Sequence, residues 1–455
     1  MSSRLIRNFQ MEDHGIRSLR IGDMNNDGCA ELVMVQSYPM NREICAITAL
    51  DLDGNVLWQH GELLEECNWY YSDIPVQIID WDGDGCNEVI YVRQAYYKSA
   101  HMWSYSKGGY VDKMDPTLEE LRVNPDLATE RAFEYEGDAK LVVLNGVTGE
   151  VKQEIPIPAP ADDCIAVGYF DGTGKPNIVA KDRYWNMWAI ANDGTVLWQI
   201  TGKEMKVDLG HFPAVGDIDG DGLDEVFISN TLIDSDGTIL WQIPDICAHH
   251  DGAYILEDIP ERRIVTVADK LRIITPDGQV VWERDGGHLQ YVHVGRFSTD
   301  SSYGPYQFLI QDYVPAAANY HEGCKGYNAQ ANSQRATLFD WYGNQLWSEE
   351  TRDRPLFRAI NWLGDCDSIL RDGCNGELKI LDIHGDVIDA ISFVTADGKP
   401  VEKELGCIAC DILGDSRDEI ILYNDTTVNI YTNTKSYIPR RFHSGISVYQ
   451  SPITR

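Results

Sequence analysis

Three short acidic loops carry the side-chain types that bind a hard cation. Each offers oxygen ligands at positions 1, 3, 5 and 9: Asp23, Asn25, Asp27 and Glu31; Asp80, Asp82, Asp84 and Glu88; and Asp217, Asp219, Asp221 and Glu225. Oxygens at this spacing wrap around Ca2+, usually with a backbone carbonyl at position 7. An EF-hand would place its last Glu at position 12 and continue into a helix, whereas strand-like residues 32–35 follow here. We therefore predict structural calcium in these loops; the alternative is acidic turns closed by their own hydrogen bonds.

A second group of residues could move protons and bind an anion. His211, the pair His249 and His250, and His288 occur in three successive stretches between repeat units. Imidazole titrates near neutral pH and can accept a proton. We predict His250 or His211 as the base, Arg183 as the group that neutralises a carboxylate, and Tyr184 as a proton donor to a leaving oxygen. Further predicted ligand contacts are His249, His288, Trp185, Lys181, Lys325 and Arg354. The alternative for His249 or His250 is a cap on a strand end.

Internal repeats indicate the elements that position these residues. Glycine is followed by tryptophan at a spacing of four, from Gly54 and Trp58 to Gly343 and Trp347, and most of these glycines follow Asp. Asp-Gly is a strong hairpin signal, because glycine supplies the positive φ of a tight turn. Combined with the acidic loops, the turns define units that start near 23, 80, 169, 217, 257, 295, 364 and 411. Separations such as 23 to 80 and 257 to 295 are typical of a four-stranded propeller blade.

We predict an all-β chain, 1–455, folded as one eight-bladed β-propeller, with seven blades as the alternative. The acidic loops are then the A–B loops and the Asp-Gly turns the C–D loops of each blade, all on one rim. The B–C and D–A connections, which carry the His, Arg and Tyr candidates, surround the funnel on the opposite face. Insertions at 94–136 and 313–335 break the spacing, so we expect them to border a ligand there, and residues 116–121 to form a short helix.

Composition excludes several classes of function. The formal net charge is −34, from 72 acidic and 38 basic residues, which argues against nucleic acid as a partner because like charges repel. No run of 18 apolar residues predicts a membrane helix, and the first residues lack the apolar core of a signal peptide. The 11 cysteines are an odd number, and the single CxxC at 407–410 lacks a second pair at zinc spacing. We expect reduced thiols and a cytoplasmic location.

Four stretches carry a resemblance to a known family. Residues 210–222 form a His-containing lead into the third acidic loop, and 249–253 is similar to a His-Gly-Asp-Ala motif with Gly and Asp exchanged. Residues 181–185 stand in place of an Arg-Gly-Tyr-Tyr run, and 411–420 with 430–432 resembles a C-terminal blade. With these motifs the chain resembles the rhamnogalacturonan lyases built on an eight-bladed, calcium-binding propeller with FG-GAP-like repeats. At 70–75 it departs from that family, because the family's His is missing.

The resemblance implies a polysaccharide lyase that cleaves uronate-containing, rhamnogalacturonan-type oligosaccharides by β-elimination, with Ca2+ as cofactor. In this reaction a cation acidifies the C5 proton of the uronate, a base removes the proton, and the 4-O-glycoside leaves. Because the net charge opposes a polyanionic substrate, the funnel must supply a local positive field. Two alternatives remain open: a non-catalytic, calcium-stabilised propeller that binds a glycan or protein, and a glycoside hydrolase that uses the same funnel.

Overall fold

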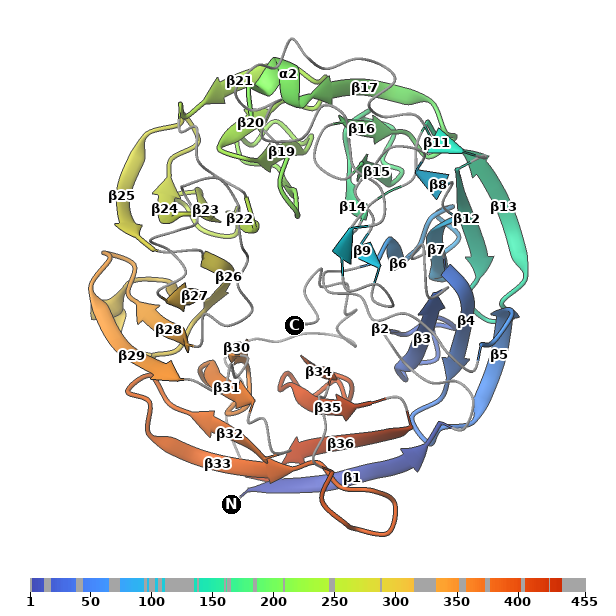
Figure 1. The fold of residues 1–455 in the computed structure, drawn as a ribbon, viewed down its shortest axis with the longest axis vertical. Helices are drawn as coiled ribbons and strands as arrows, with labels where there is room; N and C mark the ends of the chain where they lie inside the picture. The colour runs from blue at the N-terminus through green and yellow to red at the C-terminus, as the bar shows by residue number, and fades with distance from the viewer. Residues whose placement is uncertain are drawn as a thin grey trace.

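The protein is an eight-bladed β-propeller, so the predicted fold is confirmed and the seven-bladed alternative is wrong. In the computed structural model eight antiparallel four-stranded sheets stand around a central axis (Figure 1). The structure describes residues 2–11, 18–37, 44–64, 74–93, 96–97, 103–104, 109–110, 135–136, 139–158, 161, 165–182, 186–207, 209–244, 250–286, 289–314, 333–351, 357–372, 377–401, 406–424 and 426–435. Within these ranges, no helix has the length and apolar character needed to cross a membrane.

The first four blades follow one another along the chain, each from its inner to its outer strand. The first contains β2 (Ser18–Gly22), β3 (Glu31–Ser37), β4 (Ile44–Leu50) and β5 (Val56–Gly61). The second contains β6 (Val76–Ile79), β7 (Glu88–Arg93), β12 (Lys140–Asn145) and β13 (Val151–Pro156). The third contains β14 (Ile165–Gly168), β15 (Asn177–Lys181), β16 (Asn186–Ile190) and β17 (Val196–Thr201). The fourth contains β18 (Ala214–Gly216), β19 (Glu225–Ile228), β20 (Thr231–Ile233) and β21 (Ile239–Gln242).

The second half of the chain repeats the arrangement. The fifth blade contains β22 (Gly252–Leu256), β23 (Arg263–Val267), β24 (Lys270–Ile274) and β25 (Val280–Asp285). The sixth contains β26 (Leu289–Gly295), β27 (Gln307–Val314), β28 (Ser333–Phe339) and β29 (Gln345–Thr351). The seventh contains β30 (Phe357–Ile360), β31 (Ser368–Asp372), β32 (Glu377–Leu381) and β33 (Val387–Ser392). The eighth contains β34 (Gly406–Cys410), β35 (Glu419–Tyr423), β36 (Thr427–Asn433) and, as its outer strand, β1 (Ser3–Gln10).

The first and last strands that the structure describes meet in this eighth blade. Strand β1 pairs antiparallel with β36, from Ser3 opposite Asn433 to Gln10 opposite Thr427. The backbone N–H of Ser2 also donates to Asp389 Oδ2 (3.1 Å), on β33 of the seventh blade. The N-terminal strand therefore closes the ring (Figure 1).

Short elements lie outside the blades. Helix α2 (Gly202–Met205) follows β17, and a 3-10 turn (Ser301–Tyr303) precedes β27. Between β7 and β12 lie two small ladders, one of β8 (Tyr96–Tyr97) with β11 (Tyr135–Glu136), and one of β9 (Trp103–Ser104) with β10 (Gly109–Tyr110). The insertion at 94–136 is therefore a B–C connection, and 313–335 spans the B–C connection from β27 to β28. The helix expected at 116–121 lies outside the described residues.

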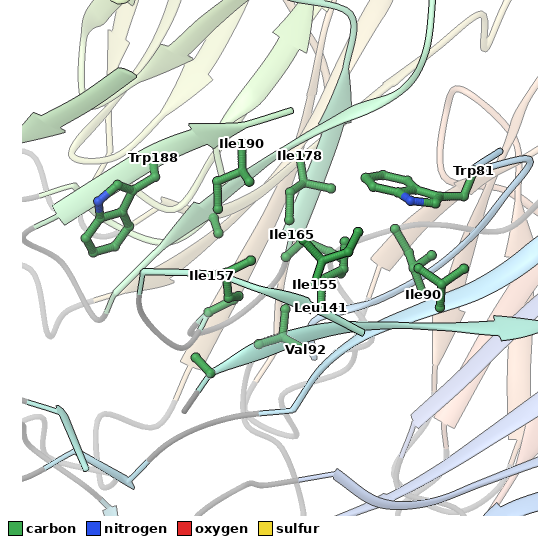
Figure 2. Close-up of a cluster of buried hydrophobic side chains, with 14 residues drawn as sticks. Trp81, Ile90, Val92, Leu141, Ile155, Ile157, Ile165, Ile178, Trp188 and Ile190 are labelled. Carbon is green, nitrogen blue, oxygen red and sulfur yellow. The ribbon is translucent and has the colours of Figure 1, made fainter. Parts of the chain in front are cut away.

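Burial follows the position of each strand in its blade. Every residue of β2, β3 and β4 is buried, because a neighbouring blade covers each face of these inner strands, whereas the outer strands β13 and β25 are mostly exposed. In the described part of the chain, each junction between neighbouring blades has its own hydrophobic cluster. Figure 2 shows the cluster between the second and third blades, where Trp81 and Ile155 meet Ile165 and Ile178.

The repeated tryptophans connect each blade to the next. Trp198 Nε1 donates to the backbone oxygen of Ser235 in the C–D turn of the following blade (2.9 Å). In the same turn a Cβ atom on Gly237 would lie 2.7 Å from the Trp198 side chain, so glycine provides both the positive φ and the space for the indole. Equivalent hydrogen bonds join Trp58 to Gly146, Trp241 to Pro276 and Trp282 to Trp341. The Asp-Gly turns therefore form part of the interface between blades.

Replacing Trp198 by alanine should destabilise the whole ring. Trp198→Ala removes a buried indole from a junction between blades, so the free energy of unfolding is expected to fall by about 3 kcal/mol. Val196→Ala, at an exposed site on the same strand, should change it by less than about 0.5 kcal/mol. Urea unfolding followed by tryptophan fluorescence and circular dichroism measures both values. Equal stabilities of the two variants would contradict this role for Trp198.

Candidate functional site

A buried acid or amide lies beneath five of the A–B loops. Glu225, the first residue of β19, accepts the backbone N–H of Ile218 at Oε2 (2.8 Å). The same bond, seven residues apart, joins Glu31 to Met24, Glu88 to Trp81, Asn177 to Phe170 and Glu419 to Ile412. Each loop is thereby anchored to strand B of its blade.

The acidic side chains also fold the loops by hydrogen bonding to loop amides. In the third loop Asp217 Oδ2 accepts from Gly222 N (3.2 Å), Asp219 Oδ1 from Asp221 N (3.0 Å), and Asp221 Oδ1 from Leu223 N (2.8 Å). Gly222 has φ of +93°, which favours glycine at this tight bend. The hydrogen bonds of an acidic turn are thus present. In addition, carboxylate oxygens of Asp217, Asp219 and Glu225 lie close to one another.

In each of the three complete loops, ligand oxygens lie within 4.8 Å of one another. The groups are Asp23, Asp27 and Glu31; Asp80, Asp82 and Glu88; and Asp217, Asp219 and Glu225. Asp84 and Asp221 were predicted as ligands but do not belong to these groups. Asn25 joins the first group through its amide, which donates to Glu31 Oε1 (3.1 Å).

The third loop fits a divalent cation. Glu225 is 0% exposed, and among the described residues its Oε1 atom has no hydrogen-bond partner. Burial raises the pKa of Glu225 to about 7, which reflects the cost of burying its charge. A cation held by Asp217, Asp219 and Glu225 would remove that cost. Arg262 contacts only Asp217 of this set, at 3.3 Å from Oδ1.

The first loop has a similar set of oxygens. Glu31 is buried, and burial raises its pKa to about 7. Carboxylate oxygens of Asp23 and Asp27 lie within 4.8 Å of Glu31. Asn25 presents its amide nitrogen to Glu31 Oε1, while its Oδ1 accepts from Asp27 N (2.9 Å), so a turn of the amide would be needed to offer that oxygen to a cation. This loop also fits a divalent ion.

The second loop differs, because an ammonium group already lies among its carboxylates. Lys152 Nζ lies 2.6 Å from Asp82 Oδ2, 2.8 Å from Glu88 Oε1 and 3.3 Å from Asp84 Oδ2. Hydrogen bonds to Asp82 and Glu88 hold the pKa of Lys152 above its usual value. Three of the four carboxylates predicted to bind calcium here are therefore in contact with a protein cation.

The A–B loops at 168–177 and 410–419 are incomplete copies of the acidic repeat, and side chains of the same blades hydrogen bond to their polar groups. Thr432 Oγ1 donates to Glu419 Oε1 (2.8 Å), and Asn177 Nδ2 donates to Asp171 Oδ2 (3.2 Å). Burial raises the pKa of Glu419 to about 7, as it does for Glu225, although Glu419 has a hydrogen-bond partner on each oxygen.

On the opposite face, successive D–A connections bring His211 and His250 together. The backbone N–H of His211 donates to the backbone oxygen of His250 (2.7 Å). Gly210 allows this contact, since a Cβ atom there would lie 2.3 Å from that same oxygen. The His211 side chain is 13% exposed, and its Nε2 lies 4.0 Å from Oδ1 of the buried Asp251. Gln290 Nε2 donates to the same Oδ1 (3.3 Å).

The two histidines differ in their access to solvent. His250 is 1% exposed, and its ring packs edge-on against Phe227, at 5.9 Å between ring centroids. The His211 ring stacks on Phe212 at 5.7 Å. Of the two bases considered from the sequence, His211 is therefore the one that reaches the surface.

Other predicted site residues are less exposed or lie outside the described ranges. Lys181 ends β15 and is 1% exposed, so it is not the loop residue that its neighbours in the sequence suggested. Arg183, Tyr184, Trp185, His249, His288, Lys325 and Arg354 lie outside the described residues.

Two residues near these sites were not singled out from the sequence. Asp251 directly follows the predicted His249 and His250, and its adjacency to them was the available signal. Lys152 lies 64 positions from Glu88 in the chain. Lys152 could have been recognised in the sequence as an exception to the repeat. Lys152 and Gln153 occupy the two positions at which most units have an aliphatic residue followed by Trp.

The sequence matches one family model and no curated protein. Residues 164–444 match the model for "Rhamnogalacturonan lyase family 11, C-terminal domain". The matched range begins just before β14 and includes His211, Asp251 and the third acidic loop. No curated protein sequence matches the chain.

Solved structures share the fold at low identity. The rhamnogalacturonan lyase PL11 of Bacillus licheniformis is 17% identical with a TM-score of 0.62, over 97% of this chain and 77% of that one. The exotype rhamnogalacturonan lyase YesX is 19% identical with a TM-score of 0.60, over 93% and 72%. The V. cholerae biofilm matrix protein Bap1 is 14% identical with a TM-score of 0.57, over 98% and 93%. At these identities the likeness establishes the fold, which hosts more than one function.

Calcium should stabilise the protein through the third loop. A cation that binds only the folded state stabilises it by about 2.7 kcal/mol at 100 times its dissociation constant. Adding calcium to chelator-treated protein is therefore expected to raise the melting temperature, and Asp217→Asn should reduce the rise. Asp236→Asn, in a C–D turn, is the matched control and should leave it intact. An unchanged melting temperature in calcium and in chelator would contradict the prediction.

Glu419 should make stability fall as pH rises. Its folded pKa of about 7 lies above the usual value of 4.5, so the folded state binds the proton more tightly. The contribution of Glu419 to the free energy of unfolding is then largest below about pH 4.5. It declines as pH rises through 7, by up to about 3 kcal/mol. Glu419→Gln keeps the shape without the charge, so its advantage over wild type should grow from pH 5 to pH 8 in chelator. Parallel urea-unfolding profiles of the two proteins would refute this assignment.

Proposed function

The chain belongs to rhamnogalacturonan lyase family 11, and from this we propose that it cleaves uronate-containing, rhamnogalacturonan-type oligosaccharides by β-elimination. The observation that carries the proposal is the family match over residues 164–444. That range contains the surface imidazole of His211 and the carboxylate of Asp251, contributed by two successive D–A connections. We place the activity in the cytoplasm, on imported fragments.

His211 is the proposed base. It accepts the C5 proton of the uronate, and the buried carboxylate of Asp251, 4.0 Å away, stabilises the imidazolium that forms. Gln290 holds Asp251 in place through its hydrogen bond to Oδ1. His250 is buried and contributes its backbone oxygen, which accepts the N–H of His211 and helps to fix its position.

The remaining steps use the B–C connection between β15 and β16. In the proposal Arg183 neutralises the uronate carboxylate, and Tyr184 donates a proton to the departing 4-oxygen as the C4–O bond breaks and a C4–C5 double bond forms. Asp182 and Asn186 pair across the base of this connection, with Asn186 N donating to Asp182 Oδ1 (2.7 Å).

Further residues would bind the substrate. Lys325 and Arg354 add positive charge, which a polyanion needs on a protein of net charge −34. Trp185, His249 and His288 contact sugar rings, and Lys181 supports this face from β15. Calcium, when bound in the A–B loops on the opposite rim, supplies charge that stabilises those loops.

The test is absorbance near 235 nm, which reports the unsaturated uronide. Wild-type protein incubated with rhamnogalacturonan oligosaccharides should produce this signal, and His211→Ala should lower kcat/KM by about 100-fold or more. His384→Ala changes an exposed histidine in a C–D turn and should leave turnover unchanged. Near-wild-type turnover by His211→Ala would overturn the assignment of the base.

The same incubation distinguishes the alternative functions. Release of reducing ends without absorbance near 235 nm would indicate a glycoside hydrolase. Oligosaccharide binding, measured by calorimetry, without any cleavage would indicate a non-catalytic propeller.

A further inference from the structure

Seven blades have a β-bulge at the same place in the C–D hairpin. In the third blade Ala189 pairs with Trp198 and Ile190 with Val196, which leaves Leu197 as the extra residue of the outer strand. Five further blades have an aliphatic residue at this position: Leu57, Leu240, Val281, Leu346 and Ile388. The repeat therefore favours an aliphatic side chain at the bulge.

The second blade departs from this rule. Val143 pairs with Gln153 and Leu144 with Val151, so the extra residue is Lys152. A bulge redirects the side chain it carries, and here it directs the ammonium group to the A–B loop of the same blade. Lys152 Nζ contacts Asp82, Glu88 and Asp84 at 2.6, 2.8 and 3.3 Å. Its side chain is 26% exposed, whereas Glu88 is 1% exposed.

A calcium ion and this ammonium group would compete for the same oxygens. Calcium binds oxygen at about 2.3–2.6 Å, so an ion held by Asp82 Oδ2 and Glu88 Oε1 would take the two oxygens that Lys152 Nζ contacts at 2.6 and 2.8 Å. A calcium ion and the Lys152 ammonium group bound to the same two oxygens would be close enough to repel each other strongly in a partly buried site. Only one of the two cations can occupy the second loop.

We propose that Lys152 is the resident cation of the second loop, and that this loop does not bind calcium. The first and third loops have Leu57 and Leu240 at the corresponding bulge. In the third loop the Arg262 guanidinium contacts Asp217 at 3.3 Å, but among the described residues it forms no ion pair with Asp219 or Glu225, whereas Lys152 contacts three carboxylates of the second loop. Calcium is therefore confined to those two of the three complete loops. The proposal concerns this rim alone and goes beyond the lyase activity.

The second loop also supports the first. Asn87 Nδ2 donates to the backbone oxygen of Asp23 (2.8 Å), and Asn26 Nδ2 donates to that of Gly85 (2.7 Å). Because Lys152 is covalently part of the chain, the second loop keeps its neutralising charge at any calcium concentration. It thereby holds part of the first loop in place before an ion arrives.

The test is calcium stoichiometry of the full chain, measured by equilibrium dialysis with radioactive calcium after chelator treatment. Wild type is expected to bind two ions, and Asp82→Asn should also bind two. Asp219→Asn, at the equivalent position of the third loop, should bind one. Loss of an ion in Asp82→Asn relative to wild type would overturn the proposal.

A reciprocal exchange at the bulge sharpens the test. Lys152→Leu restores the aliphatic residue of the repeat and should bind one more ion than wild type, and adding Asp82→Asn to it should remove that ion. Leu240→Lys brings an ammonium group to the third loop and should bind one ion fewer. Circular dichroism and melting temperature establish that each variant is folded.

The outcomes separate this proposal from calcium binding in general. If wild type bound no calcium, gain of one ion by folded Lys152→Leu would still support it, and no gain would overturn it. If Lys152→Leu failed to fold, the comparison of wild type with Asp82→Asn would decide.

Discussion

The contact between neighbouring blades is the interaction on which the rest of the structure depends. A four-stranded sheet cannot cover its own two faces, so the inner strands β2, β3 and β4 become fully buried only when blades stand on both sides. Each junction adds a hydrophobic cluster and, in several blades, a tryptophan that donates to the next turn, as Trp198 does to Ser235. A row of blades would leave two faces exposed, and pairing of β1 with β36 removes that cost by closing the ring.

The packing of blade against blade also determines where the candidate site residues lie. Because each D–A connection crosses from one blade to its neighbour, groups on successive connections become adjacent without a dedicated domain. His211 and His250 are 39 residues apart in sequence and share a backbone hydrogen bond of 2.7 Å. The A–B loops occupy the other rim, so the acidic clusters that fit a cation are separated from the face proposed to hold the substrate.

The architecture could be predicted from sequence because its signals are local. Asp-Gly turns, the tryptophan four residues after glycine, and the acidic loops each recur in several units, and the eight starts expected from them together match the eight blades. Local patterns do not show which imidazole is covered, since the burial of His250 depends on Phe227 from β19. Lys152 was missed for the same reason: its meeting with Glu88 requires the pairing of β13 with β12 and of β12 with β7.

Closure by β1 has a consequence for biosynthesis. The strand that completes the eighth blade is synthesised before the first seven blades, and its partner β36 is synthesised after them. At synthesis rates of about 5–20 residues per second, β1 waits roughly 20 to 85 seconds for β36. During that time the nascent chain exposes a growing stack of blades with two uncovered apolar faces and an unpaired strand. Exposed apolar surface and unpaired strand edges are prone to aggregation, so the interval before the ring closes is the vulnerable stage of folding.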